Sequence, residues 1–258
     1  MKYLIFPLIT FFLFSCNYTP ESDGQVLEVD KDTTVQETLE EQFIRHIESQ
    51  LKMPATEKYT YKIYKENMNP DDSIDWILTV NLRERAINKA ATSTQTAKRA
   101  EIGYMGNFNF FFFMDGKTKK MSPAIVVPSS PLAALAISFE NITSESYKDF
   151  LCDLRITNSK IRRFYTVYNG APLQVCESVI FDGVTSENNE SYVIKYEPGS
   201  YSLAKNILVY KGKMEPIELT HSDDIYTIEP EITATDELAF KWYYHPRQMK
   251  YFMKKDEL

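Results

Sequence analysis

Hydrophobic residues recur every four positions between residues 35 and 52, and this spacing predicts an amphipathic helix. Thr34 and Glu37 have the spacing of a capping box, and Pro54 follows the end of the apolar stripe. Charged residues occupy most of the other positions, so one face of the helix is expected to pack on a core. The apolar stripe consists of Val35, Leu39, Phe43, Ile44, Ile47 and Leu51.

After this helix the hydrophobic period changes from four residues to two, which is typical of half-buried strands. The pattern predicts strands over 58–65 and 75–82. Residues 108–114 are apolar at nearly every position, which predicts a strand buried on both faces. Asp115 and Gly116 then form a hairpin signal, so the strands are expected to run antiparallel.

The second half of the chain is expected to repeat this order. Residues 143–153 have the pattern of a short helix, and the dipeptide at 169–170, Asn-Gly, separates two strand-like runs at 163–168 and 173–181. An Asn-Gly dipeptide in that position predicts a two-residue hairpin. Further strands are predicted at 191–196, 202–211, 214–220 and 225–229.

These elements predict an α+β fold made of antiparallel sheets with an N-terminal amphipathic helix. Prolines at 123, 128 and 131 indicate a boundary between one α+β unit at 34–130 and another at 131–258, two similar helix-plus-meander units. The alternative is one domain. No residue-level identity links the halves, so a duplication is a conjecture. The aromatic tail at 236–254 predicts a helix interrupted at Pro246.

Residues 1–15 contain one positive charge and an apolar run too short to cross a hydrocarbon core of about 30 Å as a helix, which predicts a signal peptide. Leu13, Phe14, Ser15 and Cys16 resemble the lipobox of bacterial lipoproteins. This resemblance implies a diacylglycerol on the Cys16 thiol, cleavage before Cys16 and an acylated amine. It covers the first sixteen residues and implies nothing about activity.

Residues 16–33 contain Pro, Gly, Ser and five acidic residues, and they predict a lipid-anchored flexible linker. A coil of that length reaches about 23 Å, at roughly 5.5 Å per root residue. Asn17 differs from the Asp that retains lipoproteins in the inner membrane of enteric bacteria. The resemblance therefore implies the cell outer membrane, with the periplasmic and outer faces both open.

The C-terminus offers a rival localisation. Residues 255–258, Lys-Asp-Glu-Leu, form the endoplasmic-reticulum retention tetrapeptide, and Asn17, Asn141 and Asn189 head glycosylation sequons. Together these features would describe a lumenal glycoprotein. The envelope localisation is preferred because ordinary signal peptidase needs small residues at both −1 and −3, and Leu13 and Phe14 do not fit.

The charge balance excludes a general nucleic-acid binder. The 258 residues include 29 Lys and Arg against 36 Asp and Glu, a net charge of −7. The basic stretch at 83–100 is the exception, and it is either an exposed connector or a patch that meets an anionic partner. The cations of this patch are Arg83, Arg85, Lys89, Lys98 and Arg99.

No motif predicts a catalytic residue, a metal or a cofactor. The Gly-Lys-Thr at 116–118 lacks the first glycine of a phosphate-binding loop, and Ser202 with Lys205 lacks the partner motifs of penicillin-recognising enzymes. None of the three histidines has a second His or Cys within five residues, so a zinc site is not indicated. The histidines are His46, His221 and His245.

Two cysteines remain besides the lipid-attachment residue Cys16. Cys152 is expected on the helix at 143–153 and Cys176 on the strand at 173–181. The cell envelope is oxidising, so a disulfide is one expectation, and closing that loop would stabilise the fold by about 3.5 kcal/mol. Two buried free thiols are the other.

These features predict a cell-envelope lipoprotein with a non-enzymatic binding or scaffold role, whose partner is a protein or an envelope component. The warrant is the tether, the missing catalytic motifs and the abundance of Tyr and Phe. Two other classes stay open. A hydrolase of an envelope polymer would need a cleft with convergent acids or a Ser–His pair, and an inhibitor or immunity-type lipoprotein would need one stoichiometric partner.

Overall fold

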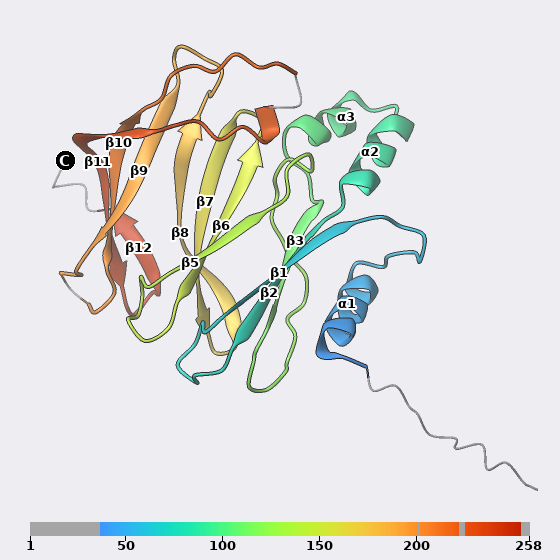
Figure 1. Cartoon of the computed structure of the whole chain (residues 1–258), viewed down its shortest axis with the longest axis horizontal. Helices are drawn as coiled ribbons and strands as arrows, with labels where there is room; N and C mark the ends of the chain where they lie inside the picture. The colour runs from blue at the N-terminus through green and yellow to red at the C-terminus, as the bar shows by residue number, and fades with distance from the viewer. Residues whose placement is uncertain (1–36, 201, 222–224, 254–258) are drawn as a thin grey trace, which may run out of the picture. The chain divides into compact units, whose positions relative to one another are not determined.

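The computed structural model describes residues 37–200, 202–221 and 225–253, apart from the side chains of 98–101. The predicted signal peptide, Cys16 and the linker lie outside the described residues, as does the C-terminal tetrapeptide. The described residues from Thr38 onward form one compact unit. Antiparallel sheets dominate this unit and a few helices accompany them, so the α+β class is confirmed (Figure 1).

The first helix, α1, spans Leu39–Gln50 and begins later than the sequence pattern predicts. Its capping box is formed by Thr38 and Glu41, because the Glu41 carboxylate accepts from the Thr38 amide at 2.7 Å while the Thr38 hydroxyl accepts from the Glu41 amide. Thr34, the predicted cap, lies outside the described residues. Phe43 and Ile47 are fully buried against the first sheet.

The first sheet has four antiparallel strands in the order β1-β2-β3-β4. The strands predicted at 58–65, 75–82 and 108–114 are confirmed. Phe111 and Phe113 face one core while Phe112 faces the other core together with α1, so β3 is buried on both faces. The strands are β1 (Thr60–Glu66), β2 (Asp75–Asn81), β3 (Asn109–Met114) and β4 (Ile125–Val126).

The basic stretch forms two short helices between β2 and β3. They are α2 (Arg83–Thr92) and α3 (Thr96–Gly103), and α2 buries Ala86 and Ala90. The expected connector is therefore helical, and Ala86 of α2 belongs to the same core as Phe112.

The second sheet has eight antiparallel strands in the order β12-β11-β10-β9-β8-β7-β6-β5 (Figure 1). The predicted Asn-Gly hairpin is confirmed, because Asn169 and Gly170 both have positive φ, as a type I′ turn requires. The strands are β5 (Ala136–Glu140), β6 (Asp149–Ile156), β7 (Ser159–Tyr168), β8 (Ala171–Asp182), β9 (Glu190–Glu197), β10 (Asn206–Lys213), β11 (Thr233–His245) and β12 (Lys250–Met253).

Two predicted helices are wrong. Residues 143–153, expected as a helix, lead into β6, whose apolar run fits a strand because both of its faces are buried. The tail at 236–254 contains β11 and β12 instead of a helix broken at Pro246, since aromatic residues pack well on a pleated sheet. The strands predicted at 214–220 and 225–229 are also absent from the described residues.

The two sheets share a core. Phe111 of β3 packs edge-on against Phe150 of β6 and Tyr165 of β7, with ring centroids 5.4 Å and 5.2 Å away. Phe150 and Tyr165 stack at 4.8 Å. A second core lies on the other face of the eight-stranded sheet, where Leu151, Phe164 and Ile207 meet.

Three hairpins have a common design. The loops at 67–74, 141–148 and 198–205 each have eight residues and follow a strand that ends in Glu. The next strand begins with a buried Asp or Asn that pairs with that Glu. The pairs are Glu66 with Asp75, Glu140 with Asp149, and Glu197 with Asn206.

The hairpins are also joined to one another. Lys148 donates its amide to the Asn67 carbonyl at 2.9 Å and its ammonium to Glu66 at 2.9 Å. Lys205 repeats this pattern one hairpin further on, because its amide reaches the Ile142 carbonyl at 2.8 Å and its ammonium lies 4.0 Å from Glu140. Lys148 therefore ties the second hairpin to the end of β1, and Lys205 ties the third hairpin to the end of β5.

Candidate binding groove

A groove follows the free edge of β1, and we call it the β1 groove. Among the described residues β1 pairs with β2 and with no other strand. One wall consists of 56–64 and the other of 132–136, with Asn81 of β2 and α2 between them. Three adjoining cavities of about 390, 740 and 620 Å³ occupy it, each within the range of ligand sites.

Two buried asparagines fix the second wall. Asn81 donates to the Asn109 side-chain oxygen at 2.8 Å and to the Pro131 carbonyl at 2.9 Å. Asn109 donates to the carbonyls of Ser130 and Ala133, both at 3.0 Å. Buried amides need such partners, so the pair holds this segment in place.

The role of these two asparagines was not predicted from the sequence. The available signal was their position, because each stands at the end of a strand whose neighbouring residues are almost all apolar: Asn81 ends β2 and Asn109 begins β3. A polar side chain inside such a strand must find a hydrogen-bond partner when the sheet is covered.

The groove is closed at one end and open at the other. At the closed end Tyr64 of β1 and Phe139 of β5 meet with ring centroids 6.5 Å apart. At the open end Arg85 makes a bidentate ion pair with Glu57, with both nitrogen–oxygen distances at 2.5 Å. Arg85 also donates to the Leu51 carbonyl at 3.3 Å, so this end is fixed as well.

The residues that line the groove carry an excess of positive charge. Five cations and two acids line its three cavities, in a chain whose net charge is −7. Glu57 neutralises Arg85, and Glu84 is the other acid. Lys89 lies 5.4 Å from the ring of Phe108. The five cations are Lys58, Lys62, Arg83, Arg85 and Lys89.

The structure therefore brings three residues of the predicted anionic-partner patch to one place. Arg83, Arg85 and Lys89 project from α2 into the open end of the groove. The side chains of Lys98 and Arg99 lie outside the described residues. That the patch meets an anionic partner stays a prediction.

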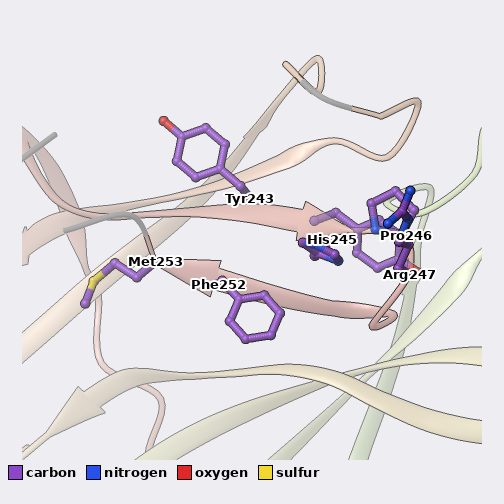
Figure 2. Close-up of a pocket in the computed structure, with 7 residues that line it drawn as sticks. Tyr243, His245, Pro246, Arg247, Phe252 and Met253 are labelled. Atoms are coloured by element: carbon purple, nitrogen blue, oxygen red, sulfur yellow. The ribbon is translucent and has the colours of Figure 1, made fainter. Parts of the chain in front are cut away.

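A separate cavity of about 550 Å³, away from the β1 groove, lies on the hairpin of β11 and β12 (Figure 2). We call it the β12 cavity. Every residue that lines it comes from this one hairpin. The ring of His245 lies 6.1 Å from that of Phe252, and Phe252 is 44% exposed. The lining residues are Tyr243, Tyr244, His245, Pro246, Arg247, Phe252 and Met253.

Two buried carboxylates serve the hairpin loops. Asp75 accepts from the amides of Met68 and Gly116, at 3.1 Å and 2.7 Å, and Asp149 accepts from the Thr143 amide at 2.5 Å and its hydroxyl at 2.7 Å. Burial raises the pKa of both carboxyls. Neither lines a cavity described here, so their oxygens hold turns in place.

Other candidate chemistry is not assembled in the described part of the chain. His46 lies 3.0 Å from the Ser122 carbonyl through Nε2, which is a local contact between α1 and the β3–β4 connection. No group of three or more His, Cys, Asp or Glu residues is placed to hold a metal ion within 37–200, 202–221 and 225–253.

Cys152 and Cys176 are both buried and free in the structure. They lie in β6 and β8, on either side of β7, where Cys152 pairs with Arg163 and Cys176 with Phe164. Adjacent residues of a strand point to opposite faces, so the two thiols belong to different cores. Burial raises the pKa of each thiol to about 12.

Comparisons with family models, curated proteins and solved structures found no match to this chain. Among the helices of the described residues, none has the length and apolar character needed to cross a membrane.

Proposed function

We propose that this chain is a cell-envelope lipoprotein, anchored through Cys16, whose folded part binds a partner in the β1 groove and catalyses no reaction. The observation that carries the binding role is the groove itself. It combines a strand edge that no described strand pairs with, a fixed second wall and an excess of cations in one place. Rigid walls reduce the ordering that binding requires.

The anchor is proposed on the sequence. The support is the lipobox-like pattern of residues 13–16 and the composition of 16–33, which is typical of a flexible linker. The amphipathic helix predicted near the start of the folded unit belongs to this proposal. Its amphipathic character is supported by α1, in which Phe43 and Ile47 are buried and Glu40 is exposed. The outer membrane is the proposed location, with its face left open.

Binding is preferred to hydrolysis because the carboxylates considered below are occupied by an ion pair or by hydrogen bonds to loops. Hydrolysis of a polymer needs two carboxyl groups, or a nucleophile and a base, that converge on one cavity. In the β1 groove Glu57 is occupied by Arg85. Asp75 and Asp149 accept hydrogen bonds from loop amides.

The intact mass of the natively expressed protein tests the anchor. We expect a mature chain that begins at Cys16 with added acyl mass, and loss of that mass in Cys16→Ser. A chain without acyl mass that carries sugar at Asn141 or Asn189 would contradict the envelope proposal and support the endoplasmic-reticulum alternative.

A photo-crosslinking experiment tests the groove. A photoreactive phenylalanine replaces Tyr61 in the groove or Phe252 in the β12 cavity, which are matched because each is 44% exposed. Irradiation of intact cells should give one discrete adduct from position 61 and none from position 252. Equal yields of adduct at both positions, or no adduct at position 61, would contradict the groove as the binding site.

A further inference from the structure

We propose that the occupant of the β1 groove is an extended acidic polypeptide segment of a partner protein, which joins the sheet as a strand beside β1. This inference rests on the proposed binding function and adds the chemistry and geometry of the partner. Three features of the structure carry it: the backbone edge, the second wall and the sign of the charge.

The backbone of β1 offers an unfilled hydrogen-bonding edge. In an antiparallel pair, alternate residues direct their N–H and C=O groups toward the partner strand, and the residues between direct theirs away from it. Among the described strands only β2 pairs with β1, so the outward groups of Thr60–Glu66 have no partner strand there, and residues 60–64 border the groove. An extended peptide satisfies such groups by β-strand addition.

The cavities along β1 provide room for the side chains of an added strand. Neighbouring strands lie about 4.8 Å apart, and alternate side chains of the new strand would point to opposite faces. One face of that strand meets the cavity lined by Thr79, Asn81 and Leu135. The segment 132–136 forms the far wall and is held by Asn81 and Asn109. The contact of Tyr64 with Phe139 sets the end of the groove.

The charge selects an acidic segment. Lysines on an edge strand normally prevent pairing with another strand, because an apolar partner would bury them. An acidic strand removes that penalty, since opposite charges across a strand pair attract. Lys58, Lys62 and Arg83 are all exposed along the groove.

The same lysines argue against a second copy of this chain as the occupant. A pairing of β1 with β1 would bring Lys62 and Lys65 of both copies into one strand pair. Like charges across a strand pair repel. A polyanion without amide groups would gain from the cations and leave the backbone edge unfilled.

The test uses the purified lipidated protein in detergent and a fluorescent peptide in which glutamate alternates with valine over about seven residues. One control peptide has lysine in place of glutamate. A second keeps the glutamates and has alternate backbone nitrogens methylated, which removes the donors along one edge and leaves the charge unchanged.

We expect the acidic peptide to bind and to slow hydrogen exchange along 60–66. The affinity should fall as salt rises, because the ion pairs are exposed. The lysine peptide should not bind, and the methylated peptide should bind at least about tenfold more weakly. Equal binding of the acidic and methylated peptides would mean that charge alone attracts the ligand, and strand addition would be wrong.

Matched protein variants localise the effect. Lys62→Glu should weaken peptide binding about tenfold, because an attractive cross-strand pair becomes a repulsive one. Lys250→Glu makes the same change in charge on β12, the outer strand of the other sheet, and should change the affinity less than about twofold. Equal losses in both variants would contradict the site.

The outcomes separate this inference from the proposed function. A crosslinked adduct at Tyr61 without binding of the acidic peptide would remove the strand inference and leave the binding function. The acidic linker at 16–33 is the competing occupant, so Glu28→Gln with Asp30→Asn neutralises part of it. If the peptide binds only to that variant, the groove holds the chain's own linker and the partner inference fails.

Discussion

The outer strands β1 and β12 face solvent in different ways. Tyr61 on β1 and Phe252 on β12 are equally exposed, at 44%. The β1 groove has a second wall, 132–136, which comes from a different part of the chain. The β12 cavity is lined by its own hairpin (Figure 2). Exposure of an aromatic residue therefore does not distinguish a binding groove, whereas a wall supplied by a distant segment does.

The polar support of the two regions differs as well. Asn81 and Asn109 tie the second wall of the β1 groove to the middle of the first sheet. In the β12 cavity, His245, Pro246 and Arg247 are exposed at the turn of the hairpin. A wall that is anchored in a sheet keeps its shape before a ligand arrives, which is what pre-organised recognition needs.

The largest expected effect comes from the core beneath the groove. Phe111→Ala should lower the free energy of unfolding by about 3–5 kcal/mol, because it leaves a cavity between the two sheets where Phe111 meets Phe150 and Tyr165. Phe252→Ala, at the β12 cavity, should cost less than about 1 kcal/mol because its ring is already partly in water. Urea unfolding measures both, and equal losses would contradict the shared core.

The second effect concerns the anchored wall. Asn109→Ala should cost about 2–3 kcal/mol, because the Asn81 amide loses one of its acceptors and two buried carbonyls lose their 3.0 Å bonds to Asn109. The Ser130 carbonyl keeps a longer bond from the Ala133 amide at 3.3 Å, and the Ala133 carbonyl keeps one from the Asn81 side chain at 3.4 Å. The exposed Asn188→Ala should change stability by less than about 0.5 kcal/mol. The test also includes acidic-peptide binding, which should weaken in Asn109→Ala under conditions where the variant is folded. Unchanged binding would show that the wall needs no anchor.

The third effect compares an arginine from each region. Arg85→Ala should cost about 1 kcal/mol, because it removes a bidentate and partly buried ion pair with Glu57. Arg247→Ala at the exposed β12 hairpin should be within about 0.5 kcal/mol of the native protein. Thermal unfolding provides the readout. A loss at Arg247 as large as that at Arg85 would remove this contrast between the regions.

The sequence predicted the strands of the first sheet because a period of two and the run of phenylalanines in β3 leave little choice. The prediction of a helix at 143–153 was wrong, because the apolar residues of β6 suit a buried helix and a buried strand equally well. These residues are Phe150, Leu151, Cys152 and Leu154. Short apolar runs do not separate these states without the neighbouring strands. The helix predicted for the tail at 236–254 was wrong for a related reason, because β11 and β12 are defined by their pairing with each other.

Only the charge of the candidate site could be predicted from the sequence. The positive charge of Arg83, Arg85 and Lys89 could be read directly, because it stands out from an acidic chain. The rest of the site could not be predicted from the sequence. The segment 132–136 meets β1 only after the sheet forms, and the hydrogen bond between Asn81 and Asn109 joins two strands. Hydrophobic patterning fixes which face of a strand is buried, whereas the partner of a free edge is a tertiary property.

The smallest effect is a pH dependence at the closed end of the β1 groove, where Glu66 and Asp75 pair across β1 and β2. The hydrogen bond from Lys148 lowers the pKa of Glu66 below 4.5, while burial raises the pKa of Asp75 above 3.8. Glu66 therefore adds stability above its unfolded pKa, and this is lost as pH falls through its lowered folded pKa. Asp75 adds stability below its unfolded pKa, and this is lost as pH rises through its raised folded pKa.

Unfolding curves of the native protein, Glu66→Gln and Asp75→Asn between about pH 3 and pH 7 test this pair. The advantage of the native protein over Glu66→Gln should shrink as the solution is acidified, and its advantage over Asp75→Asn should grow. Slopes of the same sign would mean that the two carboxyls share one environment. Opposite slopes would show that the two carboxyls lie in different environments, Glu66 bound by Lys148 of the next hairpin and Asp75 buried.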